Sequence, residues 1–500
     1  MKQSGLKLQE EAMRCLLCTD APCSKVCRNG NPARAIRAIR FGNEKLAGRW
    51  IAQCTDEELE AAEKACIHYD RPIRIKELAT LLLSSQNGEN QTASSQKEEQ
   101  EKDLSIDFCG IHCENPFFLA SSAVCTNYEM VARAFDMGWG GVFYKTICMQ
   151  EIKEVSPRFD ALQEGGKSDF SGFRNMEQLS ENPHEVDFDI LHRLKQNYPT
   201  KVVIASIMGK FEEEWIQLAK MAEDAGCDAV ELNFSCPQMR LTGMGSDVGQ
   251  DYELVLFYTD YVKRNVNIPV IPKMTPNITQ INKPAMASYF GNANAISAIN
   301  TIKSITMGER AEVSGCKTVS GLSGRAVKPI ALRFILEMAQ NPILMGSHGK
   351  KVELSGIGGI ETWRDALEYI QLGCRNVQVC TAIMQYGYRI IEDLILGLQN
   401  YLAERGLSSL SSLVGEEIPN FVSPGDLDRD TIVYPKIDRE HCIGCGRCFT
   451  SCTDGGHQAI SFDPETRQPR IVGTKCVGCH LCRFVCPTGA IGVTKRIRKK

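Results

Sequence analysis

Between about Leu104 and Gly406, short runs of apolar and β-branched residues alternate with amphipathic stretches. The runs that predict strands are Gly141–Thr146, Val202–Met208, Ala229–Phe234, Val270–Met274, Ala295–Asn300, Val352–Ser355 and Asn376–Cys380. The amphipathic stretches, such as Phe211–Ala225 and Glu253–Asn265, predict helices between these strands. Alternation over roughly 300 residues predicts an α/β fold, a (β/α)8 TIM barrel. An open doubly wound sheet remains the alternative, because periodicity does not separate the two.

Different patterns flank this region. Residues 1–83 begin with a group of cysteines and continue as helix-favouring sequence, for example Asn31–Phe41 and Asp56–Lys64. Ser84–Lys102 is polar and lacks large apolar residues, so it cannot contribute to a core. We therefore predict a small, mainly helical segment (1–83), a linker (84–103), the barrel (104–425) and a cysteine-rich α+β module (426–500).

Composition and charge narrow the class of protein. A chain of 500 residues predicts two or three domains. The net charge of −4 gives no support for nucleic-acid binding, and no apolar run is long enough for a membrane helix. The first residues lack the apolar core of a signal peptide, so the cytoplasm is the expected location. In that reducing compartment, closely spaced groups among the 23 cysteines indicate metal binding.

The C-terminal cysteines form two runs with the spacing C-x2-C-x2-C-x3-C. In this pattern three thiolates of a run bind one iron–sulfur cube, and the fourth binds the other. Two [4Fe-4S] clusters are therefore predicted in a ferredoxin-like module, with a pair of zinc sites as the alternative. The first cube is assigned Cys442, Cys445, Cys448 and Cys486, and the second Cys452, Cys476, Cys479 and Cys482.

The N-terminal cysteines are spaced less regularly, at Cys15, Cys18, Cys23 and Cys27. Cys54 and Cys66 are the further ligand candidates before the linker. Six cysteines suffice for one complete cube but not for two all-cysteine cubes. A zinc site is the alternative to a cluster.

Polar residues at the predicted strand ends suggest a cofactor site in the barrel. Lys145 and Lys273 end two strands, where a buried lysine needs an anion or ligand unless it extends to the rim. The stretch 355–362, SGIGGIET, follows a strand and precedes a helical pattern, as in a phosphate-binding turn. No G-x-G-x-x-G with a downstream acidic residue is visible, so we predict no NAD(P) domain in this chain.

A candidate acid follows another strand. Cys236 lies in Asn233–Pro237, next to the glycine-containing loop 242–249, which could close over a substrate. A thiol can give up a proton near neutral pH, although most scattered cysteines are simply buried apolar residues. The amides of Asn175, Asn233 and Asn300 could read the donors and acceptors of a uracil-like ring, or could be ordinary surface asparagines.

Residues 104–495 closely resemble the FMN-carrying part of the dihydropyrimidine dehydrogenase family, in both its bacterial NAD-dependent and its long single-chain forms. The motifs that carry the resemblance are NFSCPQ, KMTPNIT, AINTIKS, SGIGGIET, IMQYGYRIIEDL and DLDRDTIVYPKI. The resemblance implies that Cys236 protonates pyrimidine C5 while reduced FMN passes a hydride to C6. It implies pyrimidine contacts from Asn175, Asn233, Phe234, Ser235, Asn300 and Thr301. It implies flavin contacts from Ala120, Lys145, Thr146, Lys273, Gly321, Gly358, Gly359, Ile360, Cys380 and Thr381.

The first eighty residues are similar to a different part of the long enzyme. EEAMRCLLCTDAPCSKVC resembles its N-terminal iron–sulfur segment, which implies one further [4Fe-4S] cluster on Cys15, Cys18, Cys23 and Cys66. Here the sequence departs from the family, because Ala79 occupies the place of a glutamine ligand and several other ligands are missing. A second N-terminal cluster through Cys27 and Cys54 is therefore left open.

The resemblance implies an oxidoreductase that reduces uracil or thymine with electrons from NADH. The electrons would arrive through a partner flavoprotein with NAD and FAD, in a hetero-oligomer, and pass through iron–sulfur clusters to FMN. A dihydroorotate dehydrogenase, which shares the FMN barrel, is the alternative enzyme. An electron-transfer module with a barrel that serves only for docking is the alternative outside catalysis.

Overall fold

The structure is a computed structural model that describes residues 2–68, 70–87, 102–163, 170–237, 239, 242–307, 312–313 and 316–499. Contacts divide the chain into two compact units, Lys7–Pro419 and a unit that consists mainly of Asn420–Lys500. The first unit contains the barrel and the N-terminal helices, and the second contains the C-terminal cysteine-rich module. No helix in the described ranges is long and apolar enough to cross a membrane.

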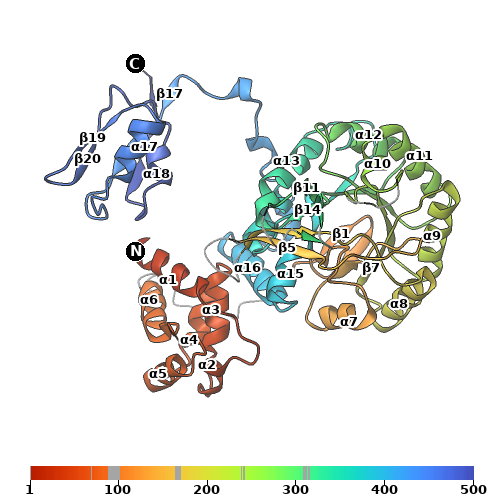
Figure 1. Cartoon of the computed structure of the whole chain (residues 1–500), viewed down its shortest axis with the longest axis horizontal. Coiled ribbons are helices and arrows are strands. Elements are labelled where there is room, and N and C mark those ends of the chain that lie inside the picture. Colours follow the sequence, from red (N-terminus) through yellow and green to blue (C-terminus); the bar gives the residue numbers. More distant parts are fainter. Residues whose placement is uncertain are drawn as a thin grey trace. The chain divides into compact units, whose positions relative to one another are not determined.

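The centre of the first unit is a closed barrel of eight parallel strands surrounded by helices (Figure 1). Its strands are β3 (Phe117–Leu119), β4 (Gly141–Phe143), β7 (Val202–Ile207), β8 (Ala229–Asn233), β9 (Val270–Lys273), β10 (Ala295–Ala298), β15 (Glu353–Ile357) and β16 (Cys374–Val379). The prediction of a (β/α)8 barrel is confirmed, and the open sheet is excluded because β3 pairs with both β4 and β16. The predicted strand Gly141–Thr146 is shorter than expected, since β4 ends at Phe143 and Lys145 lies beyond it.

The helices pack their apolar sides on the outside of the strands. They are α7 (Tyr128–Asp136), α8 (His184–Asn197), α9 (Glu212–Asp224), α11 (Tyr252–Lys263), α12 (Asn282–Phe290), α13 (Lys328–Ala339), α14 (Trp363–Gln371) and α16 (Ile390–Glu404), with the short α10 (Ser246–Gly249) and α15 (Thr381–Tyr386). The predicted helices Phe211–Ala225 and Glu253–Asn265 correspond to α9 and α11. In a hairpin of β1 (Ile106–Phe108) and β2 (Ile111–Cys113), Phe108 belongs to the same buried apolar cluster as Phe118 and Phe143 of the barrel.

A second sheet was not predicted. It is antiparallel, with the order β11 (Ile302–Ser304), β14 (Ser320–Ser323), β6 (Phe170–Asn175) and β5 (Phe159–Gln163). A further strand pair joins β12 (Glu312–Val313) to β13 (Cys316–Lys317). These strands are inserted between barrel elements, and the side chains of β5, β6 and β14 line the cleft described below.

The N-terminal segment is helical, as predicted, with α1 (Lys2–Met13), α2 (Pro22–Lys25), α3 (Pro32–Arg40), α4 (Glu44–Ile51), α5 (Asp56–Lys64) and α6 (Ile75–Asn87). It has an apolar core of its own and is anchored to α16, where the Arg37 guanidinium donates to buried Asp393 at 2.6 Å. Helix α6 continues to Asn87, so residues 84–87 of the expected linker are helical. Residues 88–101 of the expected linker lie outside the described residues.

The C-terminal module is α+β, as predicted. Three antiparallel pairs join β17 (Thr431–Ile432) to β22 (Ile497–Arg498), β18 (Pro435–Ile437) to β21 (Ile491–Val493), and β19 (Ile460–Asp463) to β20 (Gln468–Ile471). Its helices α17 (Arg447–Gly455) and α18 (Leu481–Phe484) each begin just after a glycine or histidine in the left-handed region and each carry cysteines.

Candidate functional site

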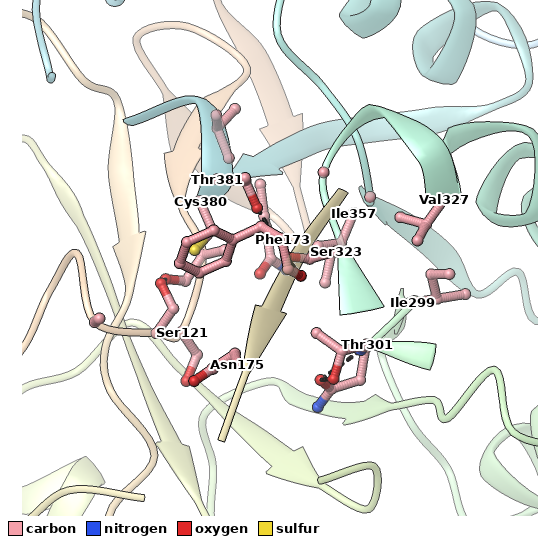
Figure 2. A pocket seen from close by; sticks show the side chains of 18 of the residues that line it. Ser121, Phe173, Asn175, Ile299, Thr301, Ser323, Val327, Ile357, Cys380 and Thr381 are labelled. Carbon is pink, nitrogen blue, oxygen red and sulfur yellow. Dashed lines mark hydrogen bonds between the residues drawn. The ribbon is translucent and has the colours of Figure 1, made fainter. Parts of the chain in front are cut away.

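A cleft lies at the carboxyl ends of the barrel strands, the end of this fold where active sites are found. It holds about 1060 Å³ of space not filled by protein atoms, part of which is open to solvent. Figure 2 shows side chains from separate parts of the chain around this space, with Ser121 and Asn175 on one side and Ile299 and Val327 on the other. The predicted site residues that line it are Ala120, Lys145, Thr146, Asn175, Asn233, Cys236, Lys273, Asn300, Thr301, Gly358, Gly359, Ile360, Cys380 and Thr381.

Both predicted lysines are buried in the cleft and paired with carboxylates. Lys145 Nζ lies 2.7 Å from Glu177 Oε2, and Lys273 Nζ lies 3.4 Å from Glu231 Oε1. Glu231 is fully buried, and its carboxylate also accepts from Ser206 and Ser297, the latter at 2.7 Å. A buried carboxylate with several donors is held in one place, so the ammonium group beside it is fixed as well.

Hydroxyl and amide groups form a network below the cleft. Asn233 donates to Thr146 Oγ1 at 2.8 Å, and Thr146 also bonds the hydroxyl groups of Ser121 and Ser206 at 3.0 Å. The Asn233 carbonyl oxygen accepts from the Ser235 hydroxyl, which in turn accepts from the Asn300 amide at 2.8 Å. Asn233 and Asn300 are therefore held in position through Ser235.

Three predicted contact residues lie outside the cleft. Phe234 points away from it and packs against Trp215 and Tyr258, with ring centroids 5.2 and 6.4 Å away. Ser235 is buried behind Asn233 and Asn300. Gly321, in β14, is pressed against Thr301, where an added Cβ would lie 2.1 Å from the hydroxyl oxygen. Phe234 and Ser235 therefore support the cleft residues from behind. Because Gly321 has no side chain, β14 can approach Thr301 closely.

The glycine-rich turn has the geometry that the sequence suggested. Gly358 and Gly359 follow β15 with φ angles of +130° and +69°, which side-chain-bearing residues rarely adopt. Helix α14 begins four residues later, with Thr362 and Asp365 in a capping box. The turn thus places backbone next to a helix N-terminus at the edge of the cleft, the arrangement that binds phosphate in many proteins.

Cys236 is 5% exposed and lines the cleft just after β8. Its carbonyl oxygen accepts from the Ser246 amide at 3.0 Å, and this bond fastens the cysteine to the following loop. The expected flexible loop 242–249 is only partly a loop, because Ser246–Gly249 forms α10 with Val248 buried. Residues 238, 240 and 241 lie outside the described residues.

Several cleft residues were missed by sequence reasoning. They are Phe159, Phe173, Glu177, Gln178, Leu322, Ser323 and Gln378. Most lie on or next to the unpredicted antiparallel sheet, whose short strands gave no clear alternation, and Gln378 lies within the predicted strand Asn376–Cys380. Gln378 donates to Ser355 at 2.9 Å, but among the described residues its buried carbonyl oxygen has no partner. Two ammonium groups, the glycine turn and an unpaired amide oxygen fit a bound polar cofactor with an anionic end, as FMN is.

The cysteines of the cluster motifs line three small cavities. One is lined by Cys15, Cys18, Cys23 and Cys66, a second by Cys442, Cys445, Cys448 and Cys486, and a third by Cys452, Cys476, Cys479 and Cys482. The last two groups are the interleaved sets expected from the spacing. Burial, together with neighbouring thiols, raises the pKa of Cys23 and of Cys482 to about 11. Four cysteine side chains converge on each cavity, and this is the ligand set of a metal centre.

Comparison with known proteins agrees with this geometry. Residues 103–402 match the dihydroorotate dehydrogenase family, and residues 435–493 match the 4Fe-4S dicluster domain. The chain is 52% identical over 396 residues to the NAD-dependent dihydropyrimidine dehydrogenase subunit PreA of Escherichia coli K12, which covers 78% of this chain and 95% of that protein. It is 37% identical over 343 residues to the chloroplastic dihydropyrimidine dehydrogenase (NADP(+)) of Arabidopsis thaliana, covering 66% and 80% of the two chains.

A third relative is the catalytic subunit of dihydroorotate dehydrogenase B (NAD(+)) from Pyrococcus horikoshii. It is 34% identical over 316 residues, which cover 62% of this chain and 97% of that protein. The match to the barrel family spans more than half of the chain, and the dicluster match favours iron–sulfur over zinc in the C-terminal module. The chain therefore belongs to the dihydroorotate dehydrogenase family of oxidoreductases and carries a 4Fe-4S dicluster domain after its barrel.

Proposed function

We propose that this protein reduces the 5,6-double bond of uracil or thymine, with FMN in the barrel cleft and Cys236 as the proton donor. The observation that carries the proposal is that the Cys236 thiol shares one cleft with three carboxamides and two buried ammonium groups. The carboxamides are those of Asn175, Asn233 and Asn300. A carboxamide offers a donor and an acceptor on one planar group, which matches the edge of a pyrimidine base.

The residues that would hold the flavin are the two lysines and the glycine turn. FMN supplies the hydride that is added to pyrimidine C6. Lys145 and Lys273 favour an electron-rich ring beside them, because their positions are fixed by Glu177 and Glu231 before any charge develops. The backbone of the turn at Gly358 and Gly359 favours the phosphate, whereas the next amides, of Glu361 and Thr362, already donate to the Asp365 carboxylate.

The thiol of Cys236 completes the reduction by giving its proton to pyrimidine C5. The thiolate left behind recovers a proton from solvent, so the cysteine returns to its starting state. Phe159 and Phe173 contact each other in the cleft, with ring centroids 5.2 Å apart, and provide an apolar wall. Such a wall limits the access of water to the reacting atoms.

Replacement of Cys236 by alanine tests this role. We expect pyrimidine turnover to fall by about 10²- to 10⁴-fold, while the flavin absorption of the purified protein stays unchanged. Cys316→Ala, at an exposed position in β13, is the matched control and should keep full activity. Near-normal turnover of Cys236→Ala would remove the thiol from the mechanism.

The electron route is part of the same proposal. Arg389 donates to the carbonyl oxygens of Leu17 and Cys18, and Arg40 donates to that of Cys15 at 3.2 Å. Arg389 follows α15 closely, and α15 begins at Thr381 in the cleft. A cluster on the N-terminal cysteines would therefore lie near the far end of a helix whose first turn borders the flavin site.

We further propose that this protein forms a hetero-oligomer with a partner flavoprotein. Electrons from NADH would reach the clusters only through that partner. Two of the relatives are named as subunits of NAD-dependent enzymes. The isolated chain should reduce pyrimidines with an artificial donor and should not oxidise NADH. Rapid NADH oxidation by the isolated chain would contradict the requirement for a partner.

Dihydroorotate oxidation is the second candidate, because 60% of the chain matches the dihydroorotate dehydrogenase family. Flavin absorption spectra recorded with uracil and with orotate separate the two, since only the true ligand should perturb the spectrum at low concentration. No change with either compound would favour a barrel that serves only in electron transfer.

A further inference from the structure

Two cysteines and one carboxylate of the N-terminal segment lie together outside the four-cysteine cavity. The Sγ atoms of Cys27 and Cys54 and a carboxylate oxygen of Glu58 all lie within 4.8 Å of one another. We propose that these three residues bind a single Zn²⁺ ion, and that the segment therefore combines one iron–sulfur site with one mononuclear metal site.

The local structure holds the carboxylate in a fixed orientation. Glu58 occupies the third position of α5, where its Oε2 accepts from the Thr55 amide at 3.0 Å in a capping box. Its Oε1 accepts from the Arg28 amide at 3.1 Å, next to Cys27 in the chain. Hydrogen bonds of this kind orient a metal ligand and raise metal affinity.

Room for the Cys54 thiol depends on Gly30. A Cβ atom at position 30 would lie 2.1 Å from Cys54 Sγ and 3.0 Å from the Trp50 carbonyl oxygen, so any side chain there would displace the thiol. Cys54 directly precedes Thr55, the N-cap of α5, so the start of this helix fixes its place in the chain. The two sulfur atoms and the carboxylate are thus brought together before any ion binds.

The same residues do not fit a second all-cysteine cube. Such a cube needs four thiolates, and only Cys27 and Cys54 remain in this segment, because Cys15, Cys18, Cys23 and Cys66 already surround their own cavity. Ala79, the position that could have supplied a fourth ligand, is 2% exposed within the apolar core of the segment. Two thiolates and one carboxylate, with water as the fourth ligand, suit a tetrahedral Zn²⁺ ion instead.

The position of the site suggests what the ion does. Cys27 lies four residues after Cys23, and α5 runs from next to Cys54 almost to Cys66. An ion bound to Cys27, Cys54 and Glu58 would therefore cross-link the two chain segments that supply ligands to the four-cysteine cavity. We infer a structural ion that holds the cluster site together.

The full-length protein, purified anaerobically with its clusters in place, provides the test. We expect one equivalent of zinc beside the iron, by inductively coupled plasma mass spectrometry. After brief chelation, titration with Co²⁺ should restore one equivalent and give the absorption of thiolate-bound tetrahedral cobalt. Glu58→Gln should weaken Co²⁺ binding at least ten-fold, because it removes the charged ligand yet keeps an acceptor for the capping box.

The control is Glu57→Gln, which changes an exposed neighbour whose carboxylate accepts a hydrogen bond from the Thr55 hydroxyl. It should bind Co²⁺ as the unmodified protein does, and both variants should keep the same iron content. Three results would overturn the proposal: no zinc and no Co²⁺ binding, a disulfide between Cys27 and Cys54 in the anaerobic protein, or four irons lost on Cys54→Ser while the other clusters persist. The last result would reveal a second cube.

Discussion

The N-terminal segment and the C-terminal module both gather cysteines, but they are built on different cores. In the N-terminal segment, sixteen buried apolar residues form a core without any fully buried cysteine, and five partly buried cysteines pack against it. In the C-terminal module, the buried cluster has six members, and three of them are Cys448, Cys452 and Cys482. We therefore expect the C-terminal module to depend on bound metal centres for folding, whereas the N-terminal helices have apolar packing of their own.

Removal of the metal centres should produce the largest difference in stability between the C-terminal module and the N-terminal segment. Anaerobic chelation removes the metal centres that would hold the cysteines of this core together, so we expect the C-terminal module to unfold. Amide hydrogen exchange should then reach the rate of an unfolded chain in β18 and β21, while α3 and α6 keep most of their protection. Equal loss of protection in both regions would show that the N-terminal core is not self-sufficient.

Breaking the anchor of the N-terminal segment should have the next largest effect. Arg37→Ala leaves Asp393 buried without its main partner, which is expected to cost about 3 kcal/mol or more. Burial already raises the pKa of Asp393 despite the nearby Arg37 guanidinium, so the charged carboxylate is poorly tolerated without that arginine. Urea unfolding followed by hydrogen exchange in α3 measures the change.

The matched control for this variant is Lys45→Ala. Lys45 pairs with Glu404 at 2.7 Å, but both side chains are more than half exposed. Its loss should cost at most about 1 kcal/mol. If Arg37→Ala costs no more than Lys45→Ala, the N-terminal segment is held to the barrel mainly by apolar contacts.

The smallest expected effect depends on pH. Glu11, 4% exposed, accepts from Arg14 and from the Arg74 amide. Burial would raise its pKa, but these donors outweigh burial and lower the pKa below its ordinary 4.5. A carboxyl group whose pKa is lower in the folded than in the unfolded protein stabilises the fold above about pH 4.5. This contribution is lost as the pH falls through the pKa of the folded state.

Glu11→Gln should therefore cost about 1 to 2 kcal/mol near pH 7. The difference from the unmodified protein should shrink steadily as the pH falls below about 4.5, the ordinary carboxyl value. Exchange protection in α1 and α6, measured across that range, gives the curve. A difference that does not vary with pH would mean that Glu11 acts through packing and not through charge.

The barrel itself was predictable because its strands are buried on both faces. Continuous apolar runs such as Val202–Ile207 mark such strands, and seven of the eight barrel strands were found in this way. The exception, β3, has three residues and follows a proline, so it is too short for a pattern. The antiparallel sheet over the cleft was missed for a different reason, since buried and partly exposed positions alternate only weakly along its strands.

The candidate site was predicted unevenly. Cys236, Lys145 and Lys273 were predicted because a thiol or an ammonium group at the end of an apolar strand usually binds a ligand or takes part in a reaction. Glu177 and Glu231 carried no such signal, although they fix the two lysines. Phe234 was expected in the cleft, but it directly follows Asn233 at the end of β8, and neighbouring side chains of an extended chain point to opposite sides, so its ring packs against Trp215.

The sequence by itself determined the fold class and the cysteine motifs, because hydrophobic periodicity and cysteine spacing are local properties of the chain. The tertiary structure alone decided which distant groups meet. Glu231 reaches Lys273 only through the pairing of β8 with β9, and Glu58 reaches Cys27 only through the packing of the N-terminal helices. Contacts between residues far apart in the chain depend on the register of packed elements, and no local pattern records that register.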